Sequence, residues 1–156
     1  MRSPLSLYAL AGWLATLHAV PALAAPAGTT GLWLDQAGRA AIDIEPCQGN
    51  SVCGTIVWLK EPLNGEGKPK IDIHNQRPEL QTRKVCGLMM LYGFSPDGSG
   101  GWKEGYIYDP SSGKTYNSQF HLKEDGTLYV RGYIGYSFLG QTQIWTRPSG
   151  ELVRCS

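Results

Sequence analysis

The feature that most constrains the fold is a series of eight short, strand-like runs separated by turn residues. The runs are rich in the β-branched and aromatic residues that favour strands. They cover residues 31–35, 39–47, 52–60, 85–94, 101–109, 114–123, 127–135 and 141–147. Clusters of Gly, Pro, Asp and Ser between the later runs are typical of hairpin turns. The alternation of apolar and polar residues in 40–45 and 116–122 indicates strands with one buried face.

Eight consecutive strands joined by hairpins predict an all-β fold, an eight-stranded antiparallel up-and-down barrel. Closure into a barrel is favoured because it removes exposed strand edges. No helical period of any length follows residue 24, although the long polar connection 61–84 has room for one turn around 78–82. The interior of an eight-stranded barrel holds either packed side chains or one small ligand, so this fold allows a binding protein.

The first 24 residues have the composition of a secretory signal peptide. Arg2 precedes an apolar run from Leu5 to Val20, and residues 22–24, Ala-Leu-Ala, supply the small residues of a cleavage site. The run is shorter than the roughly 20 residues that span a bilayer, and no cysteine lies at the cleavage point. We therefore expect an exported protein with no stable membrane anchor and one mature domain, residues 25–156.

Charge and motif content argue against nucleic-acid and nucleotide partners. The chain has 14 Lys and Arg residues against 13 Asp and Glu, with no basic cluster. We therefore expect neither nucleic acid nor an anionic membrane as the main partner. Residues 112–115, Ser-Gly-Lys-Thr, resemble the end of a phosphate-binding loop, but Tyr108 replaces its first glycine and a strand-like run follows it instead of a helix. No nucleotide or other cofactor is expected.

The chain contains four cysteines, Cys47, Cys53, Cys86 and Cys155. An even number in an exported chain predicts two disulfides, for which three pairings are possible. The turn-rich segment between Cys47 and Cys53 favours a bridge between these two, which leaves Cys86 with Cys155. Zinc ligation is the competing interpretation, but the chain has no Cys-x-x-Cys pair, so we expect no metal.

Several motifs together resemble a family of secreted bacterial proteins catalogued as domain of unknown function 2147. The motifs are Gly-Leu-Trp at 31–33 and the segments 44–63, 67–75, 106–116, 130–135 and 141–147. The resemblance implies a lipocalin-like (calycin-type) barrel located in the bacterial envelope, either periplasmic or secreted, and it implies no established activity. By similarity to lipocalins, Arg147 is expected to stack on Trp33 and to close the base of the barrel.

Aromatic and polar residues on the predicted strands are the candidates for a ligand pocket. The expected lining residues are Trp58, Tyr108, Tyr116, Arg131, Gln143 and Trp145. Aromatic walls with a few polar anchors suit a small amphipathic ligand, whose carboxylate or hydroxyl would meet Arg131 and Gln143. The pattern does not fix which strand faces point inward. The alternative is a filled barrel that serves as a structural or interaction module.

Asp72, His74 and Asn75 lie in the long connection and are expected near the barrel mouth. His74 beside Asp72 is a candidate general base for a hydrolase or isomerase. No nucleophile, metal site or oxyanion hole accompanies it, so we expect no catalytic residues. The favoured function is an exported lipocalin-like binding protein, and an envelope enzyme using His74, Asp72 or a cavity tyrosine is the alternative. The ligand's identity and the oligomeric state stay open.

Overall fold

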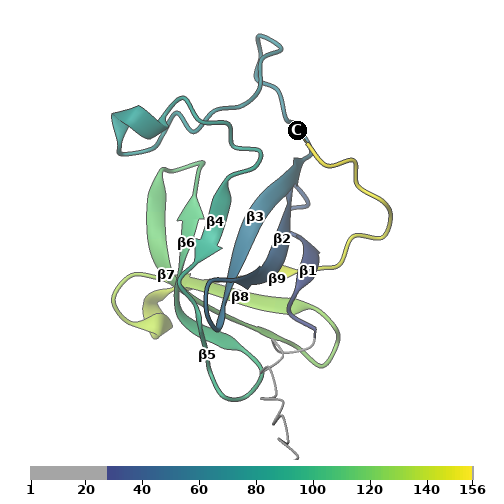
Figure 1. The fold of residues 1–156 in the computed structure, drawn as a ribbon, viewed down its shortest axis with the longest axis vertical. Helices are drawn as coiled ribbons and strands as arrows, with labels where there is room; N and C mark the ends of the chain where they lie inside the picture. Colours follow the sequence, from purple (N-terminus) through teal and green to yellow (C-terminus); the bar gives the residue numbers. More distant parts are fainter. Residues whose placement is uncertain (1–27, 156) are drawn as a thin grey trace, which may run out of the picture.

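The computed structural model describes residues 28–155, and the expected signal peptide, residues 1–24, lies outside this range. Nine strands and two short 3-10 helices follow one another within it (Figure 1). The strands are β1 (Gly31–Leu34), β2 (Ala40–Cys47), β3 (Ser51–Leu59), β4 (Met89–Tyr92), β5 (Ser95–Pro96), β6 (Trp102–Asp109), β7 (Lys114–Leu122), β8 (Leu128–Tyr133) and β9 (Gln141–Trp145). The 3-10 helices are η1 (Pro78–Leu80), between β3 and β4, and η2 (Ser137–Leu139), between β8 and β9. No helix in the described range is long and apolar enough to cross a membrane.

The strands form one antiparallel sheet in which neighbours in the chain are neighbours in space. The order is β1-β2-β3-β4-β6-β7-β8-β9, and the two-residue β5 pairs with β6 off this path. The sheet curls until β1 meets the end of β9, where Leu34 and Thr146 exchange backbone hydrogen bonds of 2.8 and 3.1 Å. The predicted eight-stranded up-and-down barrel is confirmed, and it is nearly closed.

Large aromatic side chains fill one half of the barrel. Trp33, Trp102 and Phe120 belong to the buried core, and each is almost completely buried. Many inward positions of the other half carry smaller side chains, such as Ile56 on β3 and Val130 on β8, although Tyr116 and Trp145 also point inward there. The core is therefore dense at one end of the barrel and leaves space at the other.

Arg147 closes the densely packed end. Its guanidinium carbon lies 3.7 Å from the centre of the Trp33 ring. Its two terminal nitrogens donate hydrogen bonds of 2.8–3.1 Å to the backbone carbonyls of Gly28, Thr30 and Leu32. This is the arrangement that the lipocalin similarity implied, and it joins the residues before and within β1 to the end of β9.

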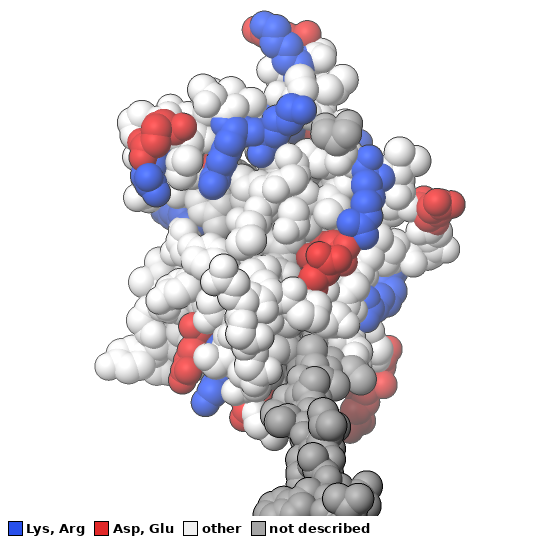
Figure 2. Space-filling model, viewed as in Figure 1, with Lys and Arg blue, Asp and Glu red and all other residues white. Residues whose placement is uncertain are grey.

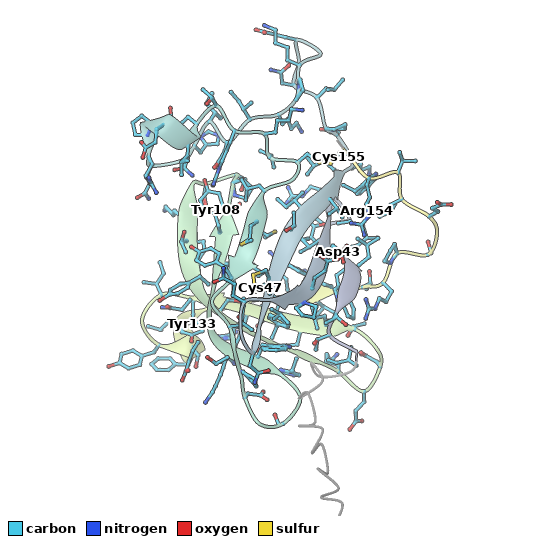
Figure 3. All side chains as sticks on the ribbon, in the orientation of Figure 1. Asp43, Cys47, Tyr108, Tyr133, Arg154 and Cys155 are labelled. Atoms are coloured by element: carbon cyan, nitrogen blue, oxygen red, sulfur yellow. A yellow bond between two sulfur atoms is a disulfide. The ribbon has the colours of Figure 1, made fainter. Side chains whose placement is uncertain are left out.

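Both expected disulfides are present. Cys47–Cys53 spans the β2–β3 hairpin with its Cα atoms 5.7 Å apart, and Cys86–Cys155 joins the C-terminal tail to the segment before β4 with a Cα separation of 6.2 Å. No cysteine in residues 28–155 is free, so none is available as a zinc ligand. The tail lies against the outer face of β2, where the guanidinium of Arg154 contacts the carboxylate of Asp43 (Figure 3).

The Ser-Gly-Lys-Thr segment, residues 112–115, covers the end of the hairpin turn between β6 and β7 and the first two residues of β7. Lys114 begins strand β7, so no helix follows the turn and no phosphate loop is formed. Gly113 has a φ of 70°, and a Cβ at this position would overlap the backbone carbonyl of His74. Glycine is therefore needed here both for the turn and for the close approach of the long connection, residues 60–88.

Candidate ligand-binding site

A cavity of about 1100 Å³ occupies the less densely packed half of the barrel. It opens where the β1–β2 turn, the long connection, the β6–β7 turn and the β8–β9 loop meet, and each of these segments contributes residues to it. Small-molecule sites typically have volumes of about 300–1,000 Å³, so this cavity is large enough for one such ligand. The barrel is not filled by its own side chains.

The wall of the cavity is mainly apolar. Its apolar members include Ala40, Ile42, Ile56, Leu59, Val85, Met90, Ile107, Val130 and Trp145. Tyr116, Gln141 and Gln143 add polar groups from β7 and β9. The indole nitrogen of Trp145 donates a 2.8 Å hydrogen bond to the side-chain oxygen of Gln143, which satisfies the indole N–H within the wall. Such a wall offers extensive apolar contact and few polar partners.

Charged side chains are confined to the mouth of the cavity. They are Asp35, Arg39, Lys60, Glu61, Lys70 and Asp109. Asp109 is occupied by its own turn, because it accepts hydrogen bonds of 2.7–2.9 Å from Ser111 and Ser112. Burial alone would raise the pKa of Asp109, but these hydrogen bonds and nearby Arg39 outweigh it and hold this pKa below its usual value. Asp109 therefore stays ionised and committed to the turn.

The remaining acidic residues of the mouth are also engaged. Asp35 accepts a 2.6 Å hydrogen bond from the backbone N–H of Arg39, and Glu61 lies 3.5 Å from the amine of Lys70. The side chains of Arg39 and Lys60 line the mouth beside these committed carboxylates. They are the cations best placed to meet an acidic group on a ligand.

A polar cluster of three buried residues, Asp72, Asn75 and Tyr108, with the half-buried Arg83, fastens the long connection to β6. Figure 3 labels Tyr108, the member of the cluster that comes from this strand. Tyr108 donates a 2.6 Å hydrogen bond to one oxygen of Asp72, and Asn75 donates a 2.8 Å hydrogen bond to the other. Arg83 reaches that second oxygen at 2.8 Å and lies over the Tyr108 ring, 5.4 Å from its centre. The Asp72 carboxylate is fully buried, and these partners compensate its desolvation. We call this set the Asp72 cluster.

The Asp72 cluster determines what the neighbouring titratable groups can do. Burial raises the pKa of Tyr108, and the hydrogen bond to Asp72 and its negative charge raise it further. His74 is exposed and lines the cavity, whereas Asp72 directs its oxygens to Tyr108, Asn75 and Arg83. The carboxylate expected to orient His74 as a general base is therefore used to hold the connection.

Four of the six residues expected at the cavity line it. Tyr116 points inward from β7, and Gln143 and Trp145 point inward from β9. Tyr108 reaches the mouth differently, because it lies on the opposite face of β6 from the core residue Ile107 and is held by the Asp72 cluster.

Trp58 and Arg131 do not line the cavity. An extra residue in β3, Val57, shifts the pairing with β2, so Trp58 lies on the outer face of the barrel. Arg131 is also on the outer face, where it donates a 2.7 Å hydrogen bond to the Thr142 hydroxyl and another to the Ser137 carbonyl. The guanidinium expected to anchor a ligand instead supports the β8–β9 loop.

Sequence reasoning missed several mouth residues, including Arg39, Lys60, Ile134 and Leu139. They lie in three separate connections and form no motif, so only the barrel topology brings them together. Within residues 28–155, no group of His, Cys, Asp and Glu side chains could hold a metal ion.

Comparisons with known proteins identify a family and a fold. The family model described as "Uncharacterized protein conserved in bacteria (DUF2147)" matches residues 31–147. The chain is also similar to a solved structure described as "Protein HP1028 from the human pathogen Helicobacter pylori belongs to the lipocalin family", with a TM-score of 0.65 and 22% identity. The similarity covers 77% of this chain and 82% of that one, and at this identity it shows the fold alone. No curated protein matches the chain. The protein therefore belongs to the bacterial DUF2147 family and has a lipocalin-like barrel.

Proposed function

We propose that this protein is an exported carrier that holds one small amphipathic molecule in its barrel. The observation that carries this proposal is the apolar cavity of about 1100 Å³, which is open at one end and closed by Trp33 and Arg147 at the other. A site of this shape buries most of a small ligand through apolar contact and leaves specificity to a few polar groups.

The distribution of polar groups gives the orientation of the ligand. The apolar part would contact Ile56, Val130 and Trp145 inside the barrel, and the polar end would remain at the mouth. Arg39 and Lys60 favour a carboxylate or another acidic group there, because hydrogen bonds to ionised partners are the stronger ones. Arg39 and Lys60 thus take the anchoring role expected of Arg131, and Gln143 would offer a neutral contact deeper in the wall.

Export is part of the same proposal. The features that support it are the signal-like composition of residues 1–24, two disulfides and membership of a bacterial family. Disulfides form and persist in oxidising compartments such as the bacterial periplasm. A carrier in that compartment would meet its ligand outside the cytoplasm.

Native mass spectrometry of the protein purified from its own cell envelope tests this function. We expect a complex with one bound amphipathic molecule, and fragmentation of the released ligand should show an apolar chain or ring system with an acidic or polar end. Masses of the bare chain alone, from gently handled envelope fractions, would contradict the carrier function.

A further inference from the structure

The β8–β9 loop, residues 134–139, presents a group of exposed apolar side chains beside the cavity mouth. Ile134, Tyr136, Phe138 and Leu139 are each between 68% and 74% exposed. The rings of Tyr136 and Phe138 stack with their centres 5.5 Å apart, and Ile134 and Leu139 also line the cavity. Contiguous apolar exposure of this kind marks a contact surface.

The loop is held outward by its own contacts. Gly135 has a φ of 72°, which redirects the chain after β8, and Arg131 donates a hydrogen bond to the Ser137 carbonyl within η2. A Cβ at Gly140 would overlap the backbone of Gly132, so the return of the chain into β9 is also fixed. In Figure 1 the loop projects from one side of the barrel, away from the C-terminal tail. The fold therefore holds these apolar side chains in their exposed positions.

The distribution of charge around the mouth also favours contact between this loop and an apolar phase. No charged residue lies between Arg131 and Arg147, so transfer of the loop into an apolar phase does not require the burial of a charge within it. Across the mouth, the long connection contributes Ile71 and Ile73, which are 41% and 60% exposed and line the cavity. Residues 60–84 also carry six Lys or Arg against four Asp or Glu. Figure 2 shows Lys and Arg side chains gathered in its upper part, where Figure 1 shows this connection.

We propose that the mouth end of the barrel docks on a phospholipid bilayer, with residues 134–139 inserted between the head groups and the acyl chains. Aromatic side chains favour this boundary, and nearby cations are attracted to anionic head groups. The small net charge of the chain, +1, argues against an anionic membrane as the main partner, but insertion of apolar side chains does not depend on net charge. A second copy of the chain fits this surface less well, because it would bring together two long connections, each with two more basic than acidic residues, and these would repel each other.

Docking would place the cavity entrance against the lipid. The apolar side chains of Ile134 and Leu139 belong both to the docking surface and to the cavity wall. An amphipathic molecule could then pass between bilayer and barrel along a continuous apolar path. This inference goes beyond ligand binding, and membrane docking can be measured without any added ligand.

Sedimentation with vesicles of phosphatidylglycerol and phosphatidylethanolamine tests the docking. We expect the exported form of the protein to bind these vesicles, and the double variant Tyr136→Ser, Phe138→Ser to lose about tenfold or more in affinity, because two inserted rings are removed. The matched control is Val153→Ser, which removes an 85% exposed apolar side chain from the C-terminal tail and should bind like the wild type. In Phe138→Trp, lipid should shift the tryptophan emission to shorter wavelength, and bromine-labelled lipid should quench it.

Three outcomes would overturn the docking proposal. They are the absence of wild-type vesicle binding, equal binding by the double variant, and a concentration-dependent dimer that the double variant abolishes while neither form binds vesicles. The last would assign the surface to a second copy of the chain. Val130→Trp, which narrows the cavity, should leave vesicle binding intact. Failure of ligand binding and failure of membrane docking can therefore be distinguished.

Discussion

Arg147 illustrates how a single side chain can determine one end of the barrel. Its planar guanidinium covers the Trp33 ring and also donates hydrogen bonds to three backbone carbonyls just before and within β1. A lysine could not reproduce this, because its ammonium is a point charge without the planar fork of donors. The contact is distant from the cavity mouth, so its role is structural.

Replacing Arg147 with Ala should lower the free energy of unfolding by about 1–3 kcal/mol, because Trp33 loses its cover and the carbonyls lose their donor. Denaturant unfolding followed by tryptophan fluorescence measures this loss. Lys68→Ala, which removes an exposed cation from the long connection, serves as the control and should change stability by less than about 0.5 kcal/mol. Equal stabilities for the two variants would contradict closure of the barrel by Arg147.

Tyr108 links the stability of the Asp72 cluster to alkaline pH. Its pKa is raised in the folded state by burial and by its hydrogen bond to Asp72, whereas tyrosine in an unfolded chain ionises near pH 10. The folded protein therefore holds this proton more tightly than the unfolded chain does. The resulting stability is fully present below about pH 10 and is lost as the pH rises through the raised folded pKa.

Tyr108→Phe should remove this alkaline dependence. Urea unfolding measured between about pH 7 and pH 11 should show the wild type losing its advantage over the variant as the pH rises. Tyr106→Phe is the matched control, because Tyr106 is on the same strand but 43% exposed, and it should follow the wild-type curve. A constant difference between wild type and Tyr108→Phe at all pH values would show that Tyr108 does not titrate in this way.

Among the structural elements, the connections carry the features that distinguish this barrel. The 60–88 connection contacts β6 at Tyr108, through the Asp72 cluster near its centre, and is held near its end by the Cys86–Cys155 disulfide. The same disulfide also ties down the C-terminal tail, whose Arg154 contacts Asp43. Its loss would release two segments, whereas loss of Cys47–Cys53 affects one hairpin.

The two disulfides should differ in their contributions to stability. The sequence separations are 69 residues for Cys86–Cys155 and 6 for Cys47–Cys53, so the chain-entropy model gives about 4 and about 2 kcal/mol respectively. Paired Cys→Ser variants of each bridge, compared by chemical denaturation, measure the difference. Peptide mapping without reduction should first find both bridges in the exported protein. A larger loss for the short bridge would show that loop closure does not control these contributions.

The strands could be predicted from the sequence, because alternation and turn residues are local signals. The side chains that point into the cavity could not be predicted in the same way, because one extra residue in a strand moves every later side chain to the opposite face. Val57 has this effect before Trp58, and the irregular pairing of β6 between Trp102 and Gly105 has it before Tyr108. Sequence spacing alone places Trp58 with Ile56, inside the barrel.

The mouth of the cavity was beyond sequence prediction for a different reason. Arg39, Lys60 and Ile134 are far apart in the chain, and none belongs to a recognisable motif. Their proximity depends on the barrel closing with these three connections at the same end. Arg131 was misplaced because its strand has two plausible faces, and the smaller residues Val130 and Gly132 take the inner one.

At the scale of the whole molecule, the barrel has two unequal ends. One is closed by aromatic packing and Arg147, and the other opens through four connections into the cavity. This asymmetry separates stability from function, because the bulky core lies away from the site where a ligand would enter. Substitutions in the cavity wall should therefore change binding while the strand pairing survives.

A binding titration shows whether the interior of the barrel is the ligand site. The wild type should bind an alkyl carboxylate that bears an environment-sensitive fluorophore, with saturation at one molecule per chain. Val130→Trp, which places an indole in the cavity, should weaken binding about tenfold or more, a loss of about 1.4 kcal/mol or more. Tyr129→Trp, a similar ring on the outer face of the same strand, should bind like the wild type. Equal affinity in all three proteins, each shown to be folded by circular dichroism, would place the ligand outside the barrel and rule out the cavity as its site.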